Sequence, residues 1–429
     1  MSADIISLLF IAFFAGLLAG FPLLATLGVA GALAIWLGDI GLVSAPAMVW
    51  SGIAKYPLLA LPLFVLAGML FERAGVAARL VALANALVGP RRGAHATVAI
   101  LVCLFLGGMS GSGTADAAAV AMVMIPTMTR HGYPPAFSAS LIAAAGATAI
   151  LIPPSIALIV YSVQVPQATV PALFSAGLVP GVLAGLALIA PALWLSWRHG
   201  FGEAGESART PWWPALKDAS WGIAAPIIIL GGLRSGAFTP TEAAVVAVAY
   251  AAFVGMLVYR TLDLCTLYRV LVDSAEISAV VMMIIAMAGV FAHAGSTLGA
   301  FDALAEALLG LTDAPLGMLA LIMLMLLIAG MLLDAVSILL IFLPILMPIV
   351  ERFGWDPVWF GVLMVMNLAI GQFTPPMAVN LMVTSRIAGV GIEKTVRWCL
   401  WMMASMLLAL LPVALWPELV LWLPRSLGY

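Results

Sequence analysis

Charged residues and cysteines are scarce in this chain. Only 8% of its 429 residues are charged, whereas soluble domains average about 25% charged residues. Hydrophobic residues make up 65%, against about 45–50% in soluble domains. A soluble fold has too little interior to bury so much apolar surface. The composition therefore predicts a polytopic membrane protein and excludes soluble enzymes. A net charge of −2 leaves no basic surface for nucleic acid, and three scattered cysteines (Cys103, Cys265 and Cys399) make neither a disulfide framework nor a metal site.

A basic segment is also missing before the first apolar stretch, which follows Asp4. We therefore expect a retained first span and not a cleaved signal peptide. The apolar pattern predicts an all-α polytopic membrane protein with about ten transmembrane helices and two re-entrant helical hairpins. The ten predicted spans are 5–20, 23–38, 56–71, 134–165, 172–197, 219–234, 240–259, 275–298, 356–386 and 397–423.

Two regions, 94–129 and 315–350, each contain two apolar arms around a tip of small residues. These arms are too short to cross the membrane as full spans. An arm of about 16 residues rises only about 24 Å as a helix, less than the ~30 Å hydrocarbon core. Each region is therefore predicted to enter and leave the membrane on the same side, with a tip of small residues at its turn.

The basic residues predict the orientation. With this layout, 13 of the 17 lysines and arginines fall on one side, which the positive-inside rule makes cytoplasmic. Both termini are then predicted to be periplasmic, in a bacterial or archaeal cytoplasmic membrane. The residues on the predicted cytoplasmic side are Arg73, Arg79, Arg91, Arg92, Arg130, Arg198, Arg209, Lys217, Arg260, Arg269, Arg386, Lys394 and Arg397.

The sequence repeats itself after a shift of 222 positions. The span before the first hairpin runs inward and its partner in the second copy runs outward, so the repeats are predicted to be inverted. Inverted repeats with broken helices are typical of secondary transporters, whose site lies near the midplane of the membrane. The matching pairs include Pro126 and Pro348, Arg130 and Arg352, Gly132 and Gly354, Pro135 and Pro357, Gly108 and Gly330, and the dipeptides Pro153-Pro154 and Pro375-Pro376.

This repeat predicts five parts of the chain. They are scaffold helices at 1–55; a first inverted repeat at 56–165 (hairpin 94–129, broken helix 134–165); scaffold helices at 166–274 with a cytoplasmic loop at 198–218; a second inverted repeat at 275–386 (hairpin 315–350, broken helix 356–386); and a C-terminal scaffold helix at 387–429.

The hairpin tips carry the polar groups of the predicted site. The first tip, 107–116, has four glycines and three hydroxyls, and irregular backbone at this depth persists only where protein or a wet cavity satisfies it. Close packing of small residues is the structural alternative. The second tip holds Asp334, and an intramembrane carboxylate indicates function. Asp116 and Asp334 also suit helix capping, and for Asp116 both interpretations stay open.

A Pro-Pro dipeptide interrupts the span after each hairpin. Two prolines remove amide donors and disrupt the preceding turn, so carbonyls near 149–152 and 371–374 lose helical partners. Such carbonyls suit a hard cation such as Na⁺, whereas a simple proline kink is the alternative. No enzymatic activity, catalytic residue or organic cofactor is expected: a triad of Ser110 or Ser112 with Asp116 and His131 fails because His131 lies in a loop far from the tip.

At these residues the chain resembles the large membrane (permease, M) subunit of tripartite ATP-independent periplasmic (TRAP) transporters. The resemblance covers nearly the whole chain, and the motifs that carry it are 57–64, 107–118, 152–155, 239–244, 330–334 and 374–376. It implies an elevator-type fold of the ion-transporter superfamily, with Na⁺-coupled uptake of an organic acid. It also implies two partners, a small four-helix membrane subunit and a periplasmic substrate-binding protein.

The resemblance also implies the site residues. A first Na⁺ site would use Gly108, Ser110, Ala149, Ile152 and Pro154, and a second would use Gly330, Gly371, Thr374 and Met377. Substrate contacts would come from Ser110, Ser112, Ser155 and Asp334. The repeat agrees, because the shift maps three residues of the second Na⁺ site onto Gly108, Ala149 and Ile152. Ala149 and Ala378 stand where the family usually has glycine.

Two other interpretations remain at this point. One is a self-sufficient Na⁺- or H⁺-coupled dicarboxylate or ion antiporter of the same wider fold group, and the other is a membrane protein that does not transport. Repeats with broken helices disfavour the latter. The sequence does not identify the organic acid.

Overall fold

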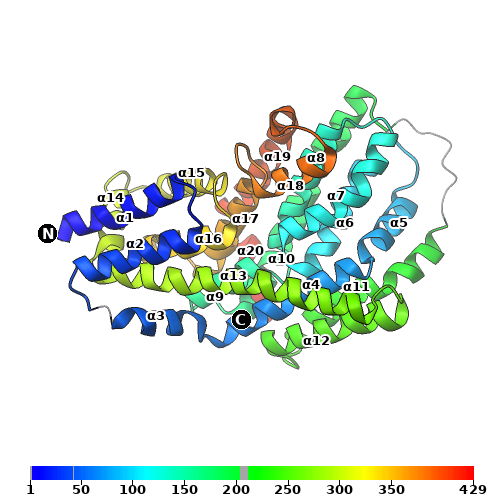
Figure 1. Cartoon of the computed structure of the whole chain (residues 1–429). Helices are drawn as coiled ribbons and strands as arrows, with labels where there is room; N and C mark the ends of the chain where they lie inside the picture. Colours follow the sequence, from blue (N-terminus) through cyan, green and yellow to red (C-terminus); the bar gives the residue numbers. More distant parts are fainter. Residues whose placement is uncertain (1, 42, 203–210) are drawn as a thin grey trace.

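A computed structural model describes residues 2–41, 43–202 and 211–429 of the chain. Within these residues every regular element is a helix (Figure 1), which confirms the predicted all-α class. Seven helices of the described part are long and apolar enough to cross a bilayer. Six of them coincide with predicted spans, and the seventh is an arm of the second hairpin. The other predicted spans form shorter or interrupted helices.

Both predicted hairpins are present. The first consists of α6 (Ala94–Ser110) and α7 (Gly113–Arg130), which pack against each other and turn at residues 111–112. The second consists of α15 (Pro315–Gly330) and α16 (Ala335–Arg352), which turn at residues 331–334. The small residues at the first tip allow this turn, because Gly111 has a positive φ of 64° that favours glycine.

Each hairpin is followed by a broken helix, as predicted. The first consists of α8 (Pro135–Ala147), a 3₁₀ turn η2 (Thr148–Ile150) and α9 (Ile156–Gln164). The second consists of α17 (Pro357–Gly371) and α18 (Val379–Ala388). In both, the chain leaves the helix before the Pro-Pro dipeptide, since proline offers no amide hydrogen and constrains the preceding residue.

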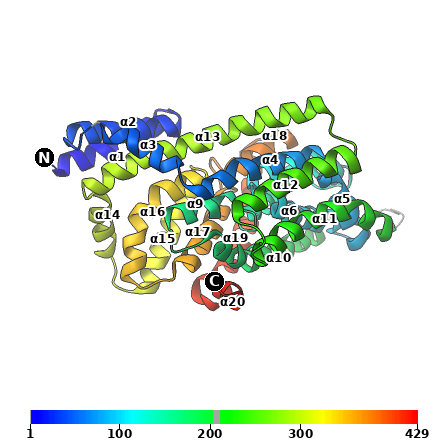
Figure 2. The ribbon, with the colours of Figure 1, turned by 90° about the horizontal axis from the view of Figure 1, so that it is seen from below.

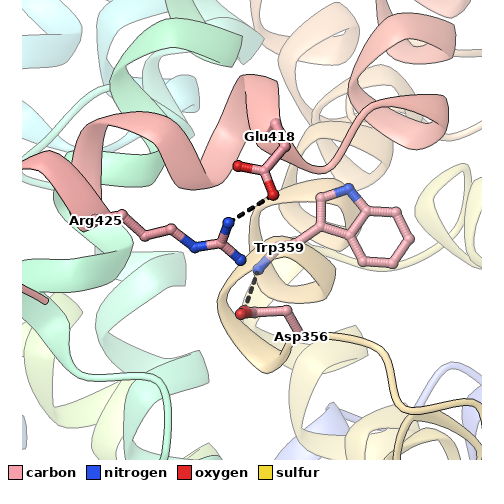
Figure 3. A network of polar contacts seen from close by, with 4 residues as sticks. All are labelled: Asp356, Trp359, Glu418 and Arg425. Carbon is pink, nitrogen blue, oxygen red and sulfur yellow. Dashed lines mark hydrogen bonds and ion pairs between the residues drawn. The ribbon is translucent and has the colours of Figure 1, made fainter.

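The start of the second broken helix is fixed by a polar network (Figure 3). Asp356 caps α17 by accepting hydrogen bonds from the amides of Val358 (2.8 Å) and Trp359 (3.2 Å). The indole of Trp359 donates to the carbonyl of Val413 at 2.8 Å. Beside it, Arg425 pairs with Glu418 at 2.5 Å. The bond from Trp359 to Val413 attaches α17 to α19 (Val396–Leu415), whereas the Asp356 bonds lie within α17 and the Arg425–Glu418 pair lies within α20 (Glu418–Ser426).

One long helix, α13 (Leu264–Thr297), runs along one side of the molecule (Figures 1 and 2). It packs against α2 (Leu23–Leu37), α3 (Ser44–Ile53) and α4 (Ala60–Arg73). The predicted span 275–298 was therefore too short. Arg269 and Asp273 interrupt the apolar run, but Arg269 is exposed and Asp273 is half-buried, and neither ends the helix.

Two further boundaries were wrong. The predicted span 397–423, and with it a single C-terminal helix in 387–429, is two helices, α19 (Val396–Leu415) and α20 (Glu418–Ser426), because Pro417 separates them. The predicted loop 198–218 is shorter, since α10 (Val170–His199) and α11 (Trp212–Arg234) extend into it. Residues 203–210 of that loop lie outside the described part. The division into scaffold and repeats stays a prediction.

The remaining helices complete the packing. The amphipathic α5 (Val76–Val88) precedes the first hairpin and packs against α6 and α11, and α14 (Ala300–Leu309) precedes the second and packs against α16. At one end α1 (Ser2–Leu18) packs on α2, and α12 (Pro240–Phe253) packs on α4. Thr239 and Glu242 form a capping box at the start of α12.

Candidate functional site

Each hairpin tip rests directly on the break of the helix that follows it. At the second tip, a Cβ built on Gly371 would lie 2.6 Å from the Cα of Gly330. At the first tip, a Cβ built on Gly107 would lie 2.8 Å from the Cα of Ala149. Side chains at these glycines would collide with backbone, so their absence is what lets the tips approach the exposed carbonyls.

The first tip also meets the first Pro-Pro dipeptide. A Cβ on Gly111 would lie 2.2 Å from the carbonyl oxygen of Pro154, and one on Gly108 would lie 3.8 Å from the carbonyl oxygen of Pro153. Two carbonyl oxygens of the break therefore face the tip. Of the predicted first-site residues, Gly108 therefore lies near the carbonyl of Pro153, and the carbonyl of Pro154 lies against Gly111.

Hydroxyls and one carboxylate organise the first tip. Ser110 is buried and donates from its Oγ to Oδ1 of Asp116 at 2.7 Å, while accepting from the amide of Ser112 at 3.2 Å. Ser112 caps α7. Asp116 is therefore not the cap: it lies in the first turn, and its second oxygen, Oδ2, is buried without a hydrogen-bond partner among the described residues.

Ser155 bridges the two sides of the first break through its hydroxyl. Its hydroxyl donates to the carbonyl of Ile150 and accepts from the amide of Leu158 at 3.3 Å, so it caps α9. The carbonyl of Ala149 accepts from the amide of Ile152 at 3.2 Å. Each of these carbonyls has a second lone pair, so both can still accept a cation.

The second tip and break show the same plan with different side chains. Asp334 caps α16, accepting from the amides of Val336 (3.0 Å) and Ser337 (3.2 Å) and from the Ser337 hydroxyl. Thr374 is buried, and its hydroxyl donates to the carbonyl of Ile370 at 2.6 Å. The threonine oxygen keeps lone pairs for a cation, and its repeat mate Ile152 has no such oxygen.

A cavity of about 200 Å³ lies between the two tips. Three of the four predicted substrate residues line it, namely Ser110, Ser112 and Asp334. The fourth, Ser155, is fully buried as a helix cap and does not line the cavity. Of the predicted Na⁺ ligands, Met377 is the outlier: it is 56% exposed, whereas the others are buried.

The cavity also contains polar residues that the sequence analysis did not assign. Thr114 lines it and donates to Oδ1 of Asn380 at 2.8 Å, which joins the first hairpin to the second broken helix. Gln372 lines it as well, and its Oε1 is buried without a partner in the described residues. The sequence signal for Thr114 and Gln372 would have been a polar side chain within an otherwise apolar segment.

The opposite wall of the cavity is apolar and comes from two long helices. It consists of Val65, Gly68 and Met69 of α4 with Ile277 and Val281 of α13. A Cβ on Gly68 would lie 2.9 Å from the Cα of Ser110, so the glycine lets α4 lie against the first tip. Among the described residues, Asp334 is the only charged residue that lines the cavity, and no basic residue does.

The available ligand atoms suit hard cations and polar organic molecules. Carbonyl, hydroxyl and carboxylate oxygens are what hard cations prefer. Within the described residues, no three His, Cys, Asp or Glu side chains come together as a transition-metal site. Inverted repeats, broken helices and a cavity between them define the class: a secondary transporter of the broken-helix type.

Comparison with known proteins identifies the family. Residues 10–419 match the family model described as "Tripartite ATP-independent periplasmic transporter, DctM component". The chain belongs to this family, the large permease subunits of TRAP transporters, and is thus a multi-pass membrane protein.

Two relatives and one solved structure illustrate this placement. The chain is 39% identical to the C4-dicarboxylate TRAP transporter large permease protein DctM of Pseudomonas aeruginosa, over 94% of both chains. It is 38% identical to the isethionate TRAP transporter permease protein DctMQ of Oleidesulfovibrio alaskensis, over 92% of this chain but only 62% of that longer protein. The Alcanivorax borkumensis YdaH transporter shares the fold, with a TM-score of 0.61 at 14% identity over 91% of this chain and 90% of that one.

Proposed function

We propose that the chain is the membrane subunit that couples uptake of an organic acid to Na⁺ entry in a TRAP transporter. The observation that carries the proposal is the duplicated contact of a hairpin tip with a proline-broken helix, seen at Gly107 and Ala149 and again at Gly330 and Gly371. Each contact places the backbone of a buried tip against the backbone of a break, with a carbonyl oxygen at the contact, and the cavity lies between the two.

Two coupling ions would occupy these contacts. The first Na⁺ would take oxygens from Gly108, Ser110, Ala149, Ile152 and Pro154, and the second from Gly330, Gly371, Thr374 and Met377. The facing carbonyls at the first tip and the Thr374 hydroxyl support this assignment. Bound Na⁺ would tie each tip to its break, so the ions would set the shape of the cavity between them.

The substrate would bind in the cavity as a carboxylate. Its negative charge would be met by hydroxyls, by the N-terminal ends of α7 and α16, and by the nearby Na⁺ ions, because no basic residue lines the cavity. Ser110 and Ser112 would contact it directly, with Asp334 opposite them. Ser155 would act through the shape of the break, which it caps.

An elevator motion would carry the site across the membrane. The wall formed by α4 and α13 offers only apolar side chains and a glycine to the cavity. The hairpins could therefore slide along it without breaking strong polar contacts at this wall. This apolar wall is the physical basis for proposing that the two hairpins move relative to α4 and α13.

The partners follow from the family. We assign the chain a small four-helix membrane subunit and a periplasmic binding protein that delivers the substrate, in a bacterial cytoplasmic membrane with both termini periplasmic. The test is reconstitution of all three components in liposomes with the ligand of that binding protein under an inward Na⁺ gradient. Uptake should require every component, and uptake that persists without the binding protein would overturn the tripartite assignment.

A further inference from the structure

A second cavity lies far along the chain from the hairpin tips, where the end of α10 meets the start of α19. Its volume is about 460 Å³, within the range of about 300–1,000 Å³ typical of small-molecule sites. It is lined by Trp194, Leu195, Arg198, His199, Arg397, Trp398 and Trp401. None of these residues belongs to the transport site.

The described side chains that line this cavity include positive charges and no negative ones. Arg198 and Arg397 both line it and no carboxylate does. Among the described residues neither guanidinium has an ion-pair partner. Arg397 lies in the first turn of α19, where the helix dipole disfavours a cation. A bound anion would offset both effects.

Aromatic rings hold these groups in place. The Cζ of Arg397 lies 4.1 Å from the ring centre of Trp398, and that of Arg198 lies 5.3 Å from the ring centre of Trp194. His199 donates from Nδ1 to the carbonyl of Leu195 at 3.0 Å, and its ring packs edge-on to Trp398. Arginines stacked on rings still present their N–H groups in the plane, in a fork that matches a phosphate.

The cavity lies at the surface of the membrane. Both α10 and α19 are apolar enough to span a bilayer, and the cavity lies at the ends of these helices that are predicted to be cytoplasmic. Its rim is apolar and open, since Trp194, Trp401 and the adjacent Leu400 are 40%, 48% and 50% exposed. Tryptophans mark the membrane interface, and basic pockets between spans on this side bind anionic lipid headgroups.

We propose that this cavity binds the phosphate of an anionic phospholipid, with Arg198 and Arg397 as its ligands and the exposed tryptophans against the acyl chains. A free phosphate would use the arginines but not the apolar rim. The bound lipid would join α10 to α19, which pack against the broken helices through α17 and α8. It would thereby stabilise the part of the protein that carries the transport site.

Native mass spectrometry of the full-length protein, with any subunit that copurifies, tests the proposal. Delipidated protein is titrated with phosphatidylglycerol, with zwitterionic phosphatidylethanolamine and with inorganic phosphate. Phosphatidylglycerol should bind at least about tenfold more tightly than phosphatidylethanolamine, because the two lipids share the phosphate but only phosphatidylethanolamine carries an ammonium group, which the two arginines repel. Equal affinity of the two lipids for the unmodified protein, or displacement of phosphatidylglycerol by an equal concentration of inorganic phosphate, would overturn it.

A matched pair of double variants locates the site. Arg198→Gln with Arg397→Gln should lower phosphatidylglycerol affinity to that of phosphatidylethanolamine. Lys217→Gln with Arg260→Gln removes the same charge from the same predicted side outside the cavity, and it should leave the preference unchanged. If both pairs reduce the preference equally, general surface charge explains binding and the proposed site is wrong. The preference of the unmodified protein remains a test if the first pair does not fold.

Discussion

Gly330 and Gly371 touch through their backbones where the second hairpin meets the second broken helix. A Cβ added to Gly330 would lie 3.0 Å from the Cα of Gly371, and one added to Gly371 would lie only 2.6 Å from the Cα of Gly330. Both atoms that a new methyl group would meet are backbone, so neither can turn away as a side chain does. The contact therefore fixes how closely the tip approaches the break.

The first prediction concerns this contact. Gly371→Ala should push the second tip from the break and weaken Na⁺ dependence, by about 1–3 kcal/mol if the cost resembles other overpacked sites. The measurement is the half-saturating Na⁺ concentration for uptake. Gly231→Ala is the matched control, because a Cβ there would meet nothing within 4 Å. Equal results for the two variants would show that the close approach does not matter for the ion.

The second prediction concerns Thr374. Thr374→Val keeps the shape of the side chain and removes the hydroxyl that donates to Ile370 at 2.6 Å. Loss of one ligand oxygen should cost about 1–3 kcal/mol, by analogy with a buried polar partner. That corresponds to roughly 5- to 150-fold weaker Na⁺ binding at one site.

The repeat provides the control for Thr374. Ile152→Val changes the equivalent position, which has no side-chain oxygen, and should leave the half-saturating Na⁺ concentration nearly unchanged. If Thr374→Val has no effect, or if both variants behave alike, the hydroxyl is not an ion ligand.

The third prediction concerns the bond between Thr114 and Asn380, which joins the two repeats. Thr114→Val leaves the buried Asn380 oxygen without this donor, so the protein should lose about 1–3 kcal/mol of stability. Thermal unfolding in detergent measures the loss. Thr127→Val is the control, because its hydroxyl bonds only to Val123 in the same helix. An unfolding temperature equal to that of the control would refute a structural role for the bond.

The sequence predicted the local features of this fold well. The first hairpin was expected at 94–129 and occupies Ala94–Arg130, because small residues and flanking loops mark its tip and ends. The extent of α13 was missed because the charges of Arg269 and Asp273 interrupt its apolar run, while its length follows from packing against α2, α3 and α4. Hydropathy does not report such packing.

The site was predictable where it repeats and not where distant segments meet. Gly330 and Gly371 were assigned through the family resemblance, and the repeat agreed because Gly108 and Ala149 stand at the equivalent positions. Thr114 and Asn380 are 266 residues apart, and no local pattern indicates that they touch. Gln372 lines the cavity, but the sequence analysis assigned only backbone carbonyls in the segment before the second Pro-Pro dipeptide and overlooked this side chain.

The fourth prediction is that the chain alone does not transport. Its family is one component of a tripartite system, and its cavity has no basic residue to capture an acid unaided. Liposomes that contain only this purified chain should show no more uptake than empty liposomes, at any substrate concentration used for the complete system. Robust uptake by the chain alone would favour a self-sufficient transporter instead.

The most direct test of the account compares two driving forces in liposomes that hold the complete transporter. One batch receives an inward Na⁺ gradient and the other an inward proton gradient of equal size, with the membrane potential clamped in both. The account predicts accumulation of substrate only with the Na⁺ gradient, because both tip contacts are built from oxygens that suit a cation. Accumulation that follows only the proton gradient would contradict it.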